Sequence, residues 1–197
     1  MRETESTVQR WSIPASSVCH VHLATLAPFP KETLMNLILW RHAEAEDGEN
    51  DMKRELTRRG QKQALQMAEW LKTQTAADAR ILVSPAERTR QTAQALSADF
   101  EIVKGLAPGK GVEELLAAIE WPGGRSEGRG ENRSGRDETV IVVGHQPTLG
   151  ATAALLIGGV EADWSVKKGA VWWLSNRVRG TTAQTVLRVV MSPDHLL

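Results

Sequence analysis

The chain has little cysteine and no long apolar run. Among its 197 residues there is a single cysteine, Cys19. A lone thiol excludes an internal disulfide framework and a zinc site built from cysteines, and it fits a reducing compartment, so we expect a cytoplasmic protein. No apolar run approaches the roughly 20 residues that a helix needs to cross a bilayer. We therefore expect no membrane partner.

The chain also lacks an excess of either charge. Its 24 Lys and Arg residues balance 24 Asp and Glu residues, and its isoelectric point is about 7.0. A basic excess would indicate nucleic acid or an acidic membrane surface, so we expect neither as a partner, although positive charge can still gather in a cleft. Hydrophobic residues make up 41% of the chain, which is ordinary for a globular protein of one well-covered domain.

The N-terminal segment, residues 1–34, shows little hydrophobic periodicity. Its mildly apolar stretch is preceded by Glu3 and Glu5, whereas a secretory signal begins with basic residues. We expect residues 1–34 to be a disordered leader or an extension from an upstream start. Met35 begins the first clear strand, so we expect the domain to comprise residues 35–197.

Short apolar runs predict the strands. Three nearly continuous runs are typical of parallel strands that are buried on both faces, and a later pair of runs indicates two antiparallel strands joined about Arg179-Gly180. The predicted strands are residues 35–40, 80–83 and 139–143, a short one at 101–103, and the antiparallel pair 170–174 and 185–190.

Helical spacing predicts four helices between these strands. Thr57 can cap the first helix, and Pro85 and Pro147 suit the first turns of the second and the fourth. The predicted helices run from Thr57 to near Thr73, from Pro85 through Leu96, over residues 112–119, and from Pro147 through Ile157.

The alternation of strands and helices predicts the fold class, an α/β three-layer sandwich with a mostly parallel central sheet. Residues 122–138 are rich in Gly, Arg, Glu and Ser and have no apolar anchor, so we expect a flexible loop there. In sheets of this kind, ligands bind at the carboxyl ends of the strands. Three polar segments leave predicted strands at that edge: Arg41-His42, Ser84 to Arg88, and Gly144-His145.

These residues suit phosphoryl transfer. The guanidinium groups of Arg41 and Arg88 present planar forks of N–H donors that match phosphate oxygens. The neutral imidazole of His42 can attack phosphorus, and the imidazole of His145, if cationic, adds donors. Phosphoryl transfer depends mainly on positioning and on stabilising charge, which these groups supply without a metal or other cofactor. Neighbouring arginines disfavour the cationic form of a histidine and so keep the nucleophile neutral.

Simpler interpretations exist for each residue. Arg41-His42 alone resembles a solvated surface pair, Arg88 could be a helix-surface charge beside Glu87 and Arg90, and His145 could cap the following helix. Two histidines could also bind zinc, but further Cys or His ligands are missing and the arginines would repel the metal. The position of each residue just past a predicted strand end favours the phosphate site.

Four segments resemble the histidine phosphatase superfamily, which has the phosphoglycerate-mutase-like fold, and within it the SixA-type phosphohistidine phosphatases. The resemblance runs from Met35 to the C-terminus, with its elements in the family's order. The matching segments are Arg41-His42-Ala43 (Arg-His-Gly in the family), residues 56–60 (Leu-Thr-x-x-Gly), residues 84–93 (Ser-Pro-x-x-Arg-x-x-Gln-Thr-Ala) and the segment around Gly144-His145.

The resemblance implies a role for each matching residue. His42 would be the phosphorylated nucleophile, and Arg41, Arg88 and His145 would bind the phosphoryl group with it. Arg54 resembles a basic residue of the SixA-type branch that faces this pocket, although it could equally be a solvated charge. Ala43 replaces the usual glycine, so the backbone there should not need a conformation that only glycine adopts.

The larger branches of the superfamily carry an acidic residue that protonates the leaving oxygen, and the corresponding stretch here, residues 104–109, contains no acid. Glu44, Glu46 and Asp47 are near the site in sequence, but nothing in the sequence defines their geometry. Alkoxide leaving groups need a general acid more than the imidazole of phosphohistidine does. We therefore favour a phosphohistidine-bearing protein as substrate, either a histidine-containing transfer domain or a phosphocarrier. For a single small domain we expect a monomer. A small phosphomonoester is the alternative, and a non-catalytic phosphate-binding module is a third.

Overall fold

The computed structural model describes residues 34–121, 138–179 and 182–196. The predicted leader, apart from Leu34, and residues 122–137 of the predicted loop lie outside that part of the chain. The last residue of the predicted loop, Glu138, is not in a loop, because it begins a strand and pairs with Met35. Backbone pairing thus extends the strand by one polar residue beyond its apolar run.

In the described part of the chain, six strands form one sheet in the order β3-β2-β4-β1-β5-β6. The first four strands pair in parallel and the last two pair antiparallel, so the predicted mostly parallel sheet is confirmed. The strands are β1 (Leu34–Arg41), β2 (Arg80–Val83), β3 (Glu101–Ile102), β4 (Glu138–Gly144), β5 (Val171–Arg179) and β6 (Thr182–Met191).

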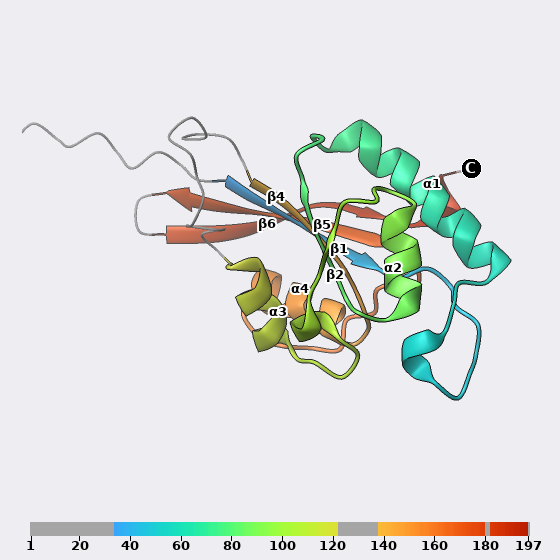
Figure 1. The fold of residues 1–197 in the computed structure, drawn as a ribbon. Coiled ribbons are helices and arrows are strands. Elements are labelled where there is room, and N and C mark those ends of the chain that lie inside the picture. The colour runs from blue at the N-terminus through green and yellow to red at the C-terminus, as the bar shows by residue number, and fades with distance from the viewer. Residues whose placement is uncertain (1–33, 122–137, 180–181, 197) are drawn as a thin grey trace, which may run out of the picture.

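Helices cover both faces of the sheet, as a three-layer sandwich requires. α1 (Arg58–Gln74) and α2 (Glu87–Gln94) pack on one face, and α3 (Val112–Ile119) and α4 (Thr148–Gly158) pack on the other (Figure 1). Side chains of β1 alternate between these two cores: Leu37 and Leu39 face α3 and α4, whereas Ile38 and Trp40 face α1 and α2. All four are 0% exposed, which confirms the prediction of a strand buried on both faces.

Some predicted boundaries were wrong. α2 ends at Gln94 rather than at Leu96, because the next residues form a tight turn in which the Leu96 N–H donates to the Ala93 carbonyl. Pro85 lies before the N-cap residue Ala86 and not in the first helical turn. β5 and β6 are longer than predicted, since they pair over polar residues such as Asn176 with Thr185.

Within the residues that the structure describes, none of the helices has the length and apolarity of a membrane crossing.

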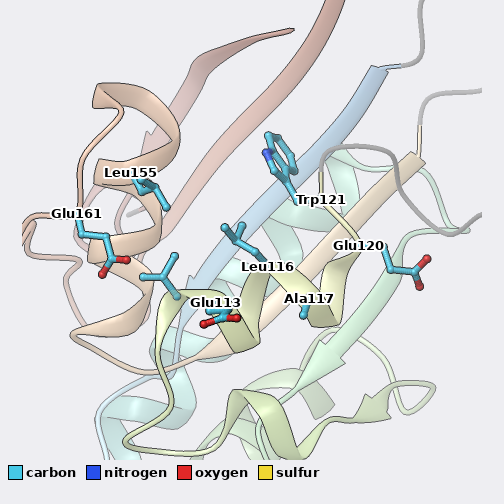
Figure 2. A pocket seen from close by; sticks show the side chains of 8 residues that line it. Glu113, Leu116, Ala117, Glu120, Trp121, Leu155 and Glu161 are labelled. Carbon is cyan, nitrogen blue, oxygen red and sulfur yellow. The ribbon is translucent and has the colours of Figure 1, made fainter.

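A groove of about 430 Å³ lies over α3 and α4 (Figure 2), and none of the predicted phosphate-site residues lines it. Its walls are Val112, Glu113, Leu116, Ala117, Glu120, Trp121, Leu155 and Glu161.

The N-terminus of α1 holds the loop that follows β1. Thr57 is the N-cap residue of α1, as predicted: its hydroxyl oxygen accepts from the Gly60 N–H at 2.8 Å, and its O–H donates to the Glu44 carboxylate at 3.0 Å. A Cβ atom on Gly60 would lie 1.9 Å from the Glu44 carbonyl oxygen. Only glycine lets the helix approach this loop so closely, which explains the Leu-Thr-x-x-Gly element physically.

We predict that Gly60→Ala lowers the free energy of unfolding by about 2 to 3 kcal/mol, because the added methyl group must displace backbone. Gly158→Ala is the matched control, since nothing lies within 4 Å of a Cβ atom there, and it should change stability by less than about 1 kcal/mol. Urea unfolding of both variants measures the difference. Equal stabilities of the two variants would refute the close approach.

Candidate active site

The carboxyl ends of three neighbouring strands bring the predicted residues together. β2, β4 and β1 are adjacent and parallel, and backbone hydrogen bonds continue past their last residues. The His42 N–H donates to the Gly144 carbonyl at 3.1 Å, and the Ser84 N–H donates to the Val143 carbonyl at 3.1 Å. The structure therefore places Arg41, His42, Ser84 and His145 at one edge of the sheet.

The ring of His42 has a defined tautomer. Its Nδ1 lies 2.7 Å from the carbonyl oxygen of Ala43, and a carbonyl oxygen can only accept, so Nδ1 carries the proton. The other nitrogen, Nε2, keeps its lone pair and accepts from the Nε–H of Arg88 at 3.3 Å. Ala43 does not have a positive φ, as expected for a residue that replaces glycine here.

The ring of His145 has the opposite tautomer. Its Nδ1 lies 3.3 Å from a terminal nitrogen of Arg88, which can only donate, so Nδ1 holds the lone pair. Its Nε2–H then donates to the Ser84 hydroxyl at 2.7 Å. The side chain does not cap α4, which was the simpler interpretation, although the His145 backbone carbonyl accepts from the Leu149 N–H.

Both rings are neutral near pH 7. Burial, together with the positive charges of Arg88, Arg41 and Arg54, lowers the pKa of His42 to about 4, against a partial rise from its hydrogen bond to Ala43. Burial, then repulsion from a protonated His42 and from Arg88 and Arg41, lowers the pKa of His145 to about 3, against a partial rise from the Asp51 carboxylate. The ring centroids are 5.2 Å apart, so two cationic rings would also repel each other. Without a bound anion His145 is thus neutral, and the cationic form considered from the sequence is not the resting state.

Arg88 joins the two histidines and is not a surface charge. Its side chain projects from α2, and the residue is only 4% exposed. Besides its bonds to His42 and His145, it donates to the backbone carbonyl of Asp51 and pairs with the Asp51 carboxylate at 3.0 Å. Arg41, His42, Arg88 and His145 are called the His–Arg cluster below.

Arg41, within the cluster, and Arg54, beside it, have further partners. Arg41 donates from one terminal nitrogen to the Val166 carbonyl at 2.6 Å, and its buried Nε has no hydrogen-bond partner among the described residues. Arg54 donates to the Glu46 carbonyl at 2.7 Å and pairs with Asp51 at 3.0 Å. Its charge lowers the pKa of His42, so it is near the cluster, but it reaches Arg88 only through Asp51.

The sequence analysis missed Asp51, which lies in the short 3-10 helix η1 (Asp51–Lys53). Burial works to raise the pKa of its carboxyl, but hydrogen bonds from Arg88 and Arg54 outweigh burial and hold the pKa below its ordinary value. A possible signal was its spacing, three residues before Arg54, which places opposite charges on one face of a helical turn. The Val166 carbonyl, which accepts from Arg41, was also missed, since the pattern of side chains in a sequence does not reveal which backbone carbonyls accept hydrogen bonds.

The acids considered from the sequence have other partners. The carboxylate of Glu44 accepts from the Thr57 hydroxyl and pairs with Arg59 at 3.5 Å, so it belongs to the start of α1. Asp47 is fully exposed and pairs with Arg54 at 3.5 Å. In the part of the chain that the structure describes, no group of three or more His, Cys, Asp or Glu side chains is placed to hold a metal ion.

Comparison with known proteins identifies the family. Residues 37–130 match the family model of the histidine phosphatase superfamily (branch 1). A phosphohistidine phosphatase SixA homolog of Haemophilus influenzae is 32% identical over 138 residues, which cover 63% of this chain and 78% of that protein. The chain belongs to the histidine phosphatase superfamily. An uncharacterized protein of Picosynechococcus sp. is similar to it as well, with 30% identity over 175 residues that cover 83% of this chain and 99% of that protein.

A solved structure shares the fold. The protein histidine phosphatase SixA complexed with tungstate aligns with a TM-score of 0.65 and 26% identity, over 83% of this chain and all of that one. The predicted phosphoglycerate-mutase-like architecture is therefore confirmed, and membership of the superfamily together with the likeness to SixA proteins supports a phosphatase.

The lowered pKa values of His42 and His145 predict how stability depends on pH. The unfolded chain protonates these rings near pH 6.5, whereas the folded protein does so only near pH 4 or 3. Between these pH values the unfolded state therefore binds more protons than the folded state. The free energy of unfolding should have its full value above about pH 7 and fall as the pH drops from about 6.5 to about 4. Each ring should account for a loss on the order of 2 kcal/mol at about pH 5.

Urea unfolding of the wild type and of His145→Gln, at about pH 7.5 and about pH 5, measures this effect. The variant should lose roughly 2 kcal/mol less than the wild type between the two pH values. Identical pH dependence of both proteins would show that the ring of His145 is not held neutral.

Proposed function

We propose that this phosphatase works without a metal, that His42 takes the phosphoryl group, and that its substrate is phosphohistidine on a protein. The observation that carries the proposal is the state of His42: a neutral ring, 8% exposed, with the lone pair of Nε2 directed at Arg88. A buried neutral imidazole with one unprotonated nitrogen beside a guanidinium has the properties of a nucleophile for an anionic phosphoryl group.

In the first step, the substrate is a phosphohistidine whose other ring nitrogen is protonated. Nε2 of His42 attacks phosphorus, and the bond between phosphorus and the leaving nitrogen breaks as the new P–N bond forms, so the substrate imidazole leaves as a neutral ring. The proton stays on Nδ1 and is donated to the Ala43 carbonyl oxygen, so that 2.7 Å hydrogen bond stabilises positive charge on the ring. Arg88 loses its acceptor when Nε2 bonds to phosphorus. Its Nε–H is then available to an oxygen of the transferring group, where negative charge develops.

The other members of the cluster supply further donors. Arg41 holds a buried Nε–H that has no partner among the described residues, and a phosphoryl oxygen would satisfy this otherwise costly group. A bound dianion favours the protonated form of His145, which could then donate from both nitrogens. Arg54 lies further out and would contact the substrate beyond the phosphoryl group. A relative in complex with tungstate, a tetrahedral oxyanion, supports anion binding by this fold.

In the second step, water attacks the phosphorus of phospho-His42 and the P–Nε2 bond breaks. Inorganic phosphate leaves, and Nε2 regains both its lone pair and its hydrogen bond from Arg88. The overall reaction is phosphohistidine plus water giving histidine plus phosphate. His42 returns to its initial tautomer because its proton has stayed on Nδ1, hydrogen-bonded to the Ala43 carbonyl, throughout.

The acids near the cluster favour phosphohistidine over an alcohol ester. Asp51 contacts Arg88, but its lowered pKa keeps it ionised near neutral pH, so it cannot give a proton to an alkoxide. Glu44 is engaged by Thr57 and Arg59. The imidazole of phosphohistidine leaves as a neutral ring once it is protonated, and therefore needs no strong acid from the enzyme. The partner would be a histidine-containing transfer domain or a phosphocarrier protein.

A phosphomonoesterase of the same superfamily remains the alternative, in which water or the substrate itself supplies the proton. A binding module is disfavoured, because binding alone would need the arginines but not the two oriented imidazoles. The monomeric state and the cytoplasmic location stay predictions from the sequence.

We predict that His42→Ala lowers the rate of phosphohistidine hydrolysis by at least about 10³-fold, because it removes the nitrogen on which the proposed covalent intermediate forms. His195→Ala is the control, since that histidine is exposed in the C-terminal 3-10 turn and the variant should keep wild-type activity. Phosphate release from a phosphorylated phosphocarrier measures both. Substantial turnover by His42→Ala would disprove the assignment.

We also predict that kcat/KM for a phosphohistidine protein exceeds that for phosphomonoesters by tenfold or more, a difference of about 1.4 kcal/mol in transition-state binding. The comparison uses one enzyme preparation, a phosphorylated histidine-containing transfer domain, and a panel of sugar phosphates, nucleotides and phosphoserine. A higher kcat/KM for any phosphomonoester would favour the alternative function.

A further inference from the structure

Arg88 has almost no hydrogen-bonding capacity left in the free protein. A guanidinium group has five N–H bonds. Its Nε–H donates to His42, one terminal nitrogen donates to the Asp51 carbonyl, and the other terminal nitrogen donates to the Asp51 carboxylate and to His145. These bonds use four of the five donors. Arg88 therefore cannot grip a phosphoryl group with two parallel hydrogen bonds unless it releases an acceptor.

The Asp51 carboxylate is the acceptor that can leave most easily. The two histidines are buried, and the Asp51 carbonyl belongs to the backbone, whereas the Asp51 side chain is 51% exposed and comes from the short helix η1. Its other oxygen accepts from Arg54 at 3.0 Å. One carboxylate thus bridges two guanidinium groups, an arrangement that a phosphoryl group can reproduce with its own oxygens.

We propose that the Asp51 carboxylate competes with the phosphoryl group for Arg88, so that substrate binding exchanges one anion for another. The inference rests on the proposed function in one respect, namely that Arg88 binds the phosphoryl group. Breaking the pair of Asp51 with Arg88 and Arg54 lowers the net affinity for every phosphate ligand. A protein substrate offsets this loss through contacts beyond the phosphoryl group, but inorganic phosphate has none. Asp51 therefore keeps the affinity for inorganic phosphate low and promotes release of the product, whereas a protein substrate still binds through its additional contacts.

The competing interpretation is that Asp51 only positions Arg88. The variant Asp51→Asn separates the two, because it removes the charge and keeps both the side-chain shape and the backbone carbonyl that accepts from Arg88. Asp47→Asn is the matched control: Asp47 is an exposed acid of the same loop that pairs with Arg54 and has no bond to Arg88. It removes the same charge from the neighbourhood without freeing a donor of Arg88.

The experiment is calorimetric titration of inorganic phosphate into the full-length wild type, Asp51→Asn and Asp47→Asn, with Asp51→Ser as a second variant should Asp51→Asn fold poorly. We expect Asp51→Asn to bind phosphate about tenfold more tightly than the wild type, and Asp47→Asn to stay within about twofold. In turnover assays, phosphate should inhibit Asp51→Asn at correspondingly lower concentrations than the wild type. The substitution should therefore change KM and the inhibition constant of phosphate, and not kcat alone.

Equal or weaker phosphate binding by both Asp51 variants would overturn the inference and leave Asp51 as a positioning residue. The same conclusion follows if no phosphate binding is detected in any of the proteins. The readout is binding, so it is independent of turnover: tighter phosphate binding by Asp51→Asn in a protein that hydrolyses no phosphohistidine would uphold the inference while refuting the proposed function.

Discussion

The hydrogen bond from the Nδ1–H of His42 to the carbonyl of Ala43 determines the chemistry of the site. It leaves the lone pair on Nε2, the nitrogen that faces Arg88. Burial and nearby positive charge keep this ring neutral, so the lone pair is not lost to a proton near pH 7. Arg88 then links the two histidines by hydrogen bonds, because the opposite tautomer of His145 leaves a lone pair on Nδ1 that accepts from Arg88. One backbone carbonyl thus orders a chain of donors and acceptors across the cluster.

The fold keeps that hydrogen bond in place from several directions. β1 ends at Arg41 between β4 and β5, and the backbone N–H of His42 continues the pairing to Gly144. On the other side, the His42 carbonyl accepts from the N–H of Gly169. The Ala43 N–H donates to the hydroxyl of Thr92 in α2, and the same hydroxyl donates to the Arg88 carbonyl. His42 and Arg88 are therefore positioned by one connected network rather than by separate loops.

Much of this arrangement could be predicted from the sequence, and the failures have physical reasons. Apolar runs revealed β1, β2 and β4 because both of their faces are buried, and residues just past strand ends must meet in a parallel sheet. The extent of β5 and β6 was underestimated because both strands continue past their apolar runs and pair there through polar residues. Asp51 resembled a solvated loop acid, since its importance comes from a contact with Arg88 37 positions away. The neutral state of His145 depends on burial, which local sequence does not reveal.

The covalent intermediate on His42 is the central claim, and trapping it is the most direct test. Wild-type protein is mixed with a phosphohistidine protein carrying labelled phosphate, quenched in alkali within the turnover time, and the labelled residue is located by peptide mapping. The account predicts label on His42, stable to base and labile to acid, as a phosphoramidate must be. Label on another residue, or turnover at full rate without label on His42, would contradict it.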